Sequence, residues 1–172
     1  VASGGDAHTT AMFSAKNMYP LDLYWFPDGI YVINTLPEYR EIMYTRLIKI
    51  NGHPIDTVTE EVSKIMSHEN HQMVKSQIKY WITLPAVLHG LGFTGGNYRT
   101  EFTFKDGKGV VRELDMKPVD GGTVFDDILG RGKDGEEVPL YMKHRDENYW
   151  FEYLRDSGVA YFKYNECAEM AS

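Results

Sequence analysis

The chain has 172 residues, enough for one domain or two small ones, and 42% of them are hydrophobic, which is ample for a buried core. The formal net charge is −7, from 18 basic and 25 acidic residues, which argues against nucleic acid as a partner because phosphate binding needs a basic face. No run of about 18 apolar residues occurs, so we expect no membrane span, and the single cysteine, Cys167, rules out an internal disulfide.

Residues 1–20 form a lead-in segment rich in small side chains. The sequence begins at Val1 rather than at methionine and shows no signal peptide, so we expect an excised piece of a longer protein. Asp6 and His8 are the one potentially catalytic pair in this segment. A structural turn in which Asp6 accepts backbone N–H bonds is favoured, because no third metal ligand lies nearby. A metal or acid–base site at Asp6 and His8 stays open as an alternative.

Residues 21–26 and 30–33 are β-prone and rich in aromatic or β-branched side chains. The turn residues Pro27-Asp28-Gly29 separate them, so the two runs predict a β-hairpin. A short helical turn is predicted next, over residues 36–41, because Pro37 suits the first turn of a helix.

The segment 46–66 carries the clearest pattern in the chain. Leu47 to Ile50 is a short apolar run broken by one lysine, and Asn51-Gly52 supplies a turn that tolerates positive φ. Thr57 is a good helix cap, and with Glu60 it has capping-box spacing. An apolar stripe then predicts an amphipathic helix. Its members are Val58, Val62, Ile65 and Met66.

Two more helices and a second hairpin are predicted after this segment. Apolar spacing indicates a helix over residues 67–82 and a shorter one over residues 83–89. Residues 98–104 and 110–116 then form the two arms of a hairpin around Asp106-Gly107.

The last part of the chain changes character twice. Residues 119–138 are polar and glycine-rich, which is typical of a loop or linker. Three aromatic, β-prone runs follow and predict a three-stranded antiparallel meander. These runs are residues 140–144, 149–154 and 159–164.

Three motifs in the chain point to one family. They are Gly5-Asp6-Ala7-His8-Thr9, the strand-turn-helix segment 48–66, and the segment from Tyr149 to Asn165. They resemble the signature before the PDZ region, the PDZ region itself and the strands leading into the peptidase core of the C-terminal-processing (tail-specific) serine peptidases. The resemblance implies a PDZ-like domain with a helical insertion at residues 21–118 and the start of a peptidase domain at residues 139–172. It also implies an extracytoplasmic or cell-envelope location.

In that family the nucleophile is a serine and the base a lysine, both beyond the position of Asn165, so the resemblance assigns no catalytic residue here. It implies a non-catalytic fragment of a serine-type peptidase that engages a peptide or unfolded protein substrate. A stand-alone peptide-binding module without peptidase activity is the alternative. We expect no cofactor and no metal, since the histidines of His68-Glu69-Asn70-His71 are not spaced as zinc ligands. The oligomeric state stays open.

PDZ-like domains hold a peptide as an added strand between a hairpin strand and a helix. By this resemblance the strand would be residues 30–33 and the helix residues 57–66. The apolar stripe on that helix is either core or groove, and core is the commoner case. Gly90-Leu91-Gly92-Phe93 spells the carboxylate-binding loop of PDZ domains, but it follows a helix instead of preceding the strand, so a helix C-cap is favoured. The predicted peptide-binding residues are Ile30, Tyr31, Val32, Val58, Val62 and Ile65.

The predicted fold class is therefore α+β. A PDZ-like sheet module with flanking helices is expected first. A β-hairpin and a short antiparallel meander from an incomplete peptidase domain are expected to follow it.

Overall fold

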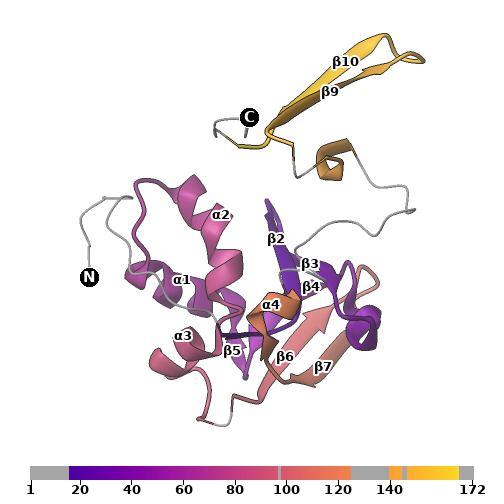
Figure 1. Ribbon diagram of the computed structural model, residues 1–172. Helices are drawn as coiled ribbons and strands as arrows, with labels where there is room; N and C mark the ends of the chain where they lie inside the picture. Colours follow the sequence, from indigo (N-terminus) through magenta and orange to yellow (C-terminus); the bar gives the residue numbers. More distant parts are fainter. Residues whose placement is uncertain (1–15, 97, 125–139, 145–146, 167–172) are drawn as a thin grey trace. The chain divides into compact units, whose positions relative to one another are not determined.

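The computed structural model describes residues 16–96, 98–124, 140–144 and 147–166 (Figure 1). These residues form an α+β fold with antiparallel sheets, as the sequence predicts. The chain divides into two compact units, residues 1–130 and 131–172, and each is described by itself. The finer division stays a prediction: residues 1–20, 21–118, 119–138 and 139–172.

The first unit is built on one antiparallel sheet. Its strands are β2 (Leu21–Phe26), β3 (Gly29–Thr35), β4 (Arg46–Ile50), β5 (His53–Pro54), β6 (Thr100–Lys105) and β7 (Val111–Met116). They lie in the order β2-β3-β4-β6-β7, while β5 pairs with the end of β4. Asn51 and Gly52 make the turn between β4 and β5 with φ angles of 49° and 79°, the left-handed conformation predicted for this dipeptide. Both predicted hairpins, β2–β3 and β6–β7, are confirmed.

Shorter elements connect and flank this sheet. A 3₁₀ helix, η1 (Pro37–Ile42), lies between β3 and β4, where Pro37 predicts a helical turn. The strand β1 (Asn17–Met18) pairs with β8 (Val119–Asp120), so the end of the lead-in segment is joined to the chain that follows β7. A single turn, α4 (Gly121–Thr123), comes after β8.

Three helices follow β5 in the chain: α1 (Ile55–Ile65), α2 (His71–Trp81) and α3 (Pro85–Gly90). Figure 1 shows them gathered on one side of the sheet. The capping box predicted at Thr57 and Glu60 is wrong, because α1 begins two residues earlier, with Pro54 as its N-cap and no capping side chain. Pro54 is already held by its pairing with Lys49 in β4, and this fixes where the helix can start.

The apolar stripe of α1 belongs to the core. Val58 and Val62 are fully buried and Met66 is 1% exposed, whereas Ile65 is 37% exposed at the margin of the stripe. They pack in one cluster with residues from the sheet and from the other two helices. The strand residues of that cluster are Leu21, Leu23, Ile30, Val32, Leu47, Ile50, Phe102 and Phe104.

The second unit contains one hairpin, formed by β9 (Tyr149–Leu154) and β10 (Val159–Tyr164). The third predicted strand of the meander, over residues 140–144, is wrong, since η3 (Leu140–Met142) is a 3₁₀ helix. The N–H of Lys143 donates to the carbonyl of Leu140 at 3.1 Å and closes a local turn. A strand needs a hydrogen-bonded neighbour, and within the described residues no strand pairs with this segment.

Replacing Val62 with aspartate should destabilise the fold by about 3 kcal/mol or more, because a carboxylate would be buried without a partner. The matched control is Ile65→Asp on the same helix, which should cost less than about 1 kcal/mol because that side chain reaches solvent. Urea unfolding followed by circular dichroism measures both losses. Equal losses would contradict the placement of this stripe in the core.

Candidate functional site

Four of the six predicted peptide-binding residues lie in the core. Ile30 is 2% exposed, and Val32, Val58 and Val62 are fully buried. The other two, Tyr31 and Ile65, are partly exposed, but they lie on different elements. Tyr31 points to the sheet face opposite Ile30 and Val32. The structure therefore does not bring the six residues together on one open surface. That they bind a peptide stays a prediction.

The strand expected to receive a peptide is not at the edge of the sheet. Ile30 pairs with Trp25 of β2 on one side and with Leu47 of β4 on the other. Tyr31 is likewise held between Tyr24 and Arg46. Backbone groups on both sides of this part of β3 are thus already used. Residues 30 and 31 therefore have no open side for a further strand, whereas the neighbouring strand β2 lies at the border of the sheet.

β2 is an edge strand of the sheet, and α2 runs beside it (Figure 1). The N–H of Tyr19, just before β2, donates to the carbonyl of Thr83, just after α2, at 2.8 Å. At the other end, the rings of Trp25 and His71 lie 6.2 Å apart, edge to face. The start of β2 therefore lies by the end of α2, and the two elements run antiparallel. An edge strand presents unpaired backbone N–H and C=O groups, so we call this border of the sheet the β2 edge.

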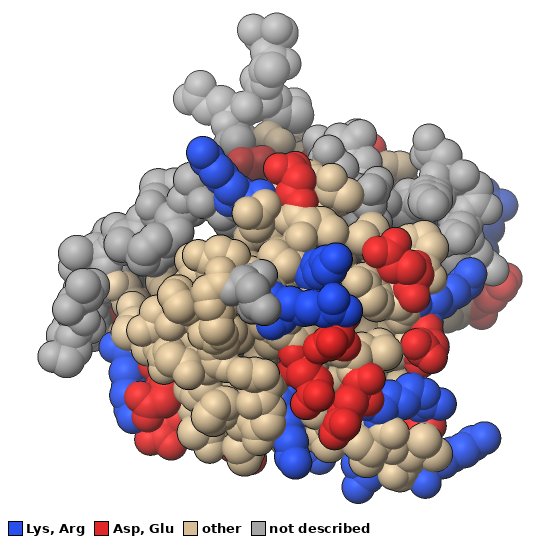
Figure 2. Space-filling view, turned by 90° about the horizontal axis from the view of Figure 1, so that it is seen from below, with Lys and Arg blue, Asp and Glu red and all other residues tan. Residues whose placement is uncertain are grey.

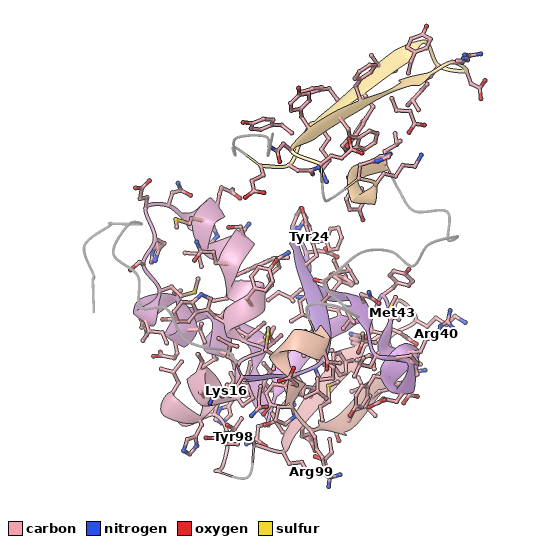
Figure 3. All side chains as sticks on the ribbon, in the orientation of Figure 1. Lys16, Tyr24, Arg40, Met43, Tyr98 and Arg99 are labelled. Carbon is pink, nitrogen blue, oxygen red and sulfur yellow. The ribbon has the colours of Figure 1, made fainter. Side chains whose placement is uncertain are left out.

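Aromatic side chains cover the outer face of the β2 edge. Tyr24 and Phe26 are 48% and 40% exposed, and their ring centroids lie 4.6 Å apart. The ring of Phe26 also meets Tyr31 at 5.6 Å. The Tyr31 hydroxyl donates to the carboxylate of Asp28 at 2.7 Å, and this hydrogen bond raises the pKa of Tyr31. Figure 3 labels Tyr24 on β2. These rings form a half-exposed apolar surface on a strand at the border of the sheet.

Two lysines of α2 lie over the aromatic rings of β2. The Lys75 ammonium is 5.7 Å from the ring centroid of Trp25, and the Lys79 ammonium is 6.0 Å from that of Tyr24. Lys79 also lies 4.9 Å from the ring of Tyr80. These contacts are cation–π interactions between helix and strand. This pair of elements differs from the strand and helix that the sequence predicts for a groove, although Lys75 and Lys79 are spaced for one helix face.

The Gly90-Leu91-Gly92-Phe93 motif is a helix C-cap, as the sequence analysis favours. The N–H of Gly92 donates to the carbonyl of His89 at 3.0 Å, and the N–H of Phe93 to that of Leu88 at 2.9 Å. Gly92 has φ of 80°, the left-handed conformation of a Schellman cap. Both N–H groups that a carboxylate loop would offer are therefore already bonded to the end of α3.

The segment around His68 and His71, whose letters resemble a zinc motif, forms no metal site in the part of the chain that the structure describes. Asn70 is the N-cap of α2, and its side chain accepts from the N–H of Met73 at 2.9 Å, so the segment around His68 and His71 is a helix start. The described residues contain no group of three or more potential metal ligands. None of their helices combines the length and apolar character needed to cross a membrane. Asp6, His8 and Cys167 lie outside the described residues.

Comparison with known proteins finds no matching family model and no matching curated protein. Among solved structures, the chain is similar to mature CPAF, determined in complex with lactacystin, with 18% sequence identity and a TM-score of 0.43. The similarity covers 77% of this chain and 25% of that chain, so this chain spans about a quarter of the length of the CPAF chain. It assigns no ligand, activity or site to this chain.

Replacing Gly92 with alanine should destabilise the fold by roughly 1–2 kcal/mol, because a Cβ is unfavourable at positive φ. The space around Gly92 is empty within 4 Å, so the cost is backbone strain and not a clash. The control is Gly90→Ala, two residues earlier and inside α3, which should be neutral or stabilising by about 0.5 kcal/mol. Thermal melts of both variants measure this difference. An unchanged melt of Gly92→Ala would contradict the cap.

Proposed function

We propose that this chain is the non-catalytic, substrate-engaging part of a serine peptidase of the C-terminal-processing type. In this proposal it holds an extended peptide, or an unfolded segment of a protein substrate, along the β2 edge. The observation that carries the proposal is an edge strand flanked by a helix, with aromatic side chains on its open border. The family motifs at residues 5–9, 48–66 and 149–165 support the peptidase parent.

Strand addition supplies affinity through the backbone. The six residues of β2 span about 20 Å at the usual rise per residue, which suits a peptide segment of similar length. Each new backbone hydrogen bond contributes roughly 0.5–1.5 kcal/mol. Aromatic rings on the strand add apolar contacts to whichever side chains the peptide presents on that face. The β2 edge therefore offers backbone hydrogen bonds, which do not depend on the peptide sequence, and apolar contacts, which do.

The opposite edge of the sheet, β7, is less suited to this role. Its sequence carries Arg112, Glu113 and Asp115 among six residues. Charged side chains on an edge strand are the usual protection against the addition of another strand. β2 carries one charged residue, Asp22, and three aromatic ones. This contrast favours the β2 edge as the place where a peptide adds.

Three of the described serines support a non-catalytic role. The hydroxyls of Ser63, Ser76 and Ser157 each donate to a backbone carbonyl three residues earlier in the chain. Nucleophilic catalysis needs a serine hydroxyl within hydrogen-bond reach of a base. Each of these three hydroxyls is instead used within its own helix or turn.

A stand-alone peptide-binding module is the second candidate, because the β2 edge would serve it equally well. The two candidates differ in the fate of the bound peptide. In a peptidase the parent polypeptide cleaves the peptide that this edge holds, whereas a binding module releases it intact.

We expect the chain to show no peptidase activity. Incubation with casein or with a fluorogenic peptide should release no more product than buffer does, because Ser63, Ser76 and Ser157 each donate their hydroxyl to a backbone carbonyl and not to a base. Turnover that disappears on mutation of a single residue of this chain, Ser157→Ala for example, would contradict the proposal.

Peptide binding should depend on backbone hydrogen bonds along one side of the peptide. A fluorescein-labelled ten-residue peptide and two versions N-methylated at alternate residues, odd or even, provide the test. One methylated version should bind about tenfold more weakly or worse, because several backbone donors are lost, and the other should bind nearly as well as the parent. Fluorescence anisotropy measures the affinities.

Amide hydrogen exchange then locates the peptide within the chain. Binding should slow exchange over residues 21–26 of β2 and leave residues 111–116 of β7 unchanged. Protection of β7 alone, or equal binding of all three peptides, would show that the β2 edge does not receive a strand.

A further inference from the structure

We propose that the peptide held along the β2 edge is acidic. In this inference, α2 selects aspartate or glutamate side chains at alternate peptide positions through His71, Lys75 and Lys79. The inference rests on the proposed function and adds the class of substrate to it.

The charge of α2 differs from that of the chain around it. The whole chain carries a net charge of −7, yet residues 71–81 contain His71, Lys75 and Lys79 and no aspartate or glutamate. The three basic residues follow one another at intervals of four, so they share one face of the helix. An acidic chain thus presents one short basic stripe.

This stripe faces the β2 edge. His71 and Lys75 both lie against Trp25, with the His71 ring at 6.2 Å and the Lys75 ammonium at 5.7 Å from its ring centroid. Lys79 lies 6.0 Å from the ring of Tyr24. The buried residues of α2, Val74 and Ile78, hold the helix to the core, so the stripe is kept at the border where a peptide would lie.

The ammonium groups of the stripe are not neutralised within the described residues, where neither Lys75 nor Lys79 forms an ion pair. Basic side chains elsewhere do form such pairs, for example Arg99 with Asp115 and Arg112 with Asp106, each at 3.3 Å. On the face shown in Figure 2, lysine and arginine side chains lie interspersed with aspartate and glutamate side chains. Glu69, just before α2, is the carboxylate nearest to the stripe in sequence, and Asp22 is the one carboxylate in β2.

The spacing of the stripe matches that of an extended peptide. Alternate residues of a β-strand repeat about every 6.8 Å. Residues four apart on an α-helix repeat about every 6 Å. A peptide strand paired with the outer side of β2, along the border that α2 flanks, can therefore place successive alternate side chains toward His71, Lys75 and Lys79. Carboxylates at those positions would accept hydrogen bonds from the ammonium groups, which now rest on aromatic rings.

The test compares two labelled ten-residue peptides, one of alternating threonine and glutamate and one of alternating threonine and glutamine. Anisotropy at low salt should show the acidic peptide binding about threefold to thirtyfold more tightly, as expected for two exposed ion pairs. The ratio should approach one at about 0.5 M salt because of screening. A third peptide of alternating threonine and lysine should bind more weakly than the neutral one.

Two double variants locate the selectivity. Lys75→Gln with Lys79→Gln should abolish the difference between acidic and neutral peptides. The control, Lys105→Gln with Lys108→Gln in the β6–β7 hairpin, changes the net charge equally and should keep the difference. Melting curves check that each variant is folded.

The outcomes separate the two proposals. Equal binding of the acidic and neutral peptides by the wild-type chain would overturn the acidic selectivity and leave strand addition intact. Acidic preference that survives in the Lys75 and Lys79 variant would overturn the role of α2. Absence of binding of all three peptides would overturn the proposed function, and the acidic selectivity with it.

Discussion

Strand β3 has a hydrogen-bonded neighbour on each side, and the arrangement of the first unit depends on that position. Its inward-facing residues, Ile30 and Val32, are enclosed in the core with Val58 and Val62 of α1. The same pairing leaves β2 at the border of the sheet. One constraint therefore decides both where the core lies and which strand lies at the border of the sheet.

Helix α2 has two functions in this arrangement. Val74 and Ile78 pack into the core, and His71, Lys75 and Lys79 line the border with β2. Because the first set anchors the helix, the second set is held at a constant distance from the strand. The bond from the Tyr19 N–H to the Thr83 carbonyl fixes the same distance at one end. Core packing thus positions the side chains on which the proposed selectivity depends.

Most elements could be predicted from the sequence because their causes are local. Asn51-Gly52 and Asp106-Gly107 each mark a turn through their own backbone preferences, and both turns are present. The N–H groups of Lys108 and Val110 donate to the Asp106 carboxylate. The bond from Val110 is the main reason why the pKa of Asp106 lies below its usual value. Two local predictions are wrong. The capping box at Thr57 does not form because the pairing of Pro54 with β4 starts α1 earlier. Residues 140–144 form no strand because no described strand pairs with them.

The sequence by itself determined the fold class, both hairpins of the first unit, their turns and the C-cap at Gly92. Periodicity, turn chemistry and cap geometry act over a few residues, so local sequence is enough for them. The tertiary structure alone decided which strand is an edge, whether the stripe of α1 is core or groove, and which helix borders the open strand. β2 and β3 have similar alternation and similar residue types, and nothing local tells a central strand from an edge strand. That difference depends on pairing partners such as Leu47 and Arg46, which follow Ile30 and Tyr31 by 17 and 15 residues and meet β3 only in the folded chain.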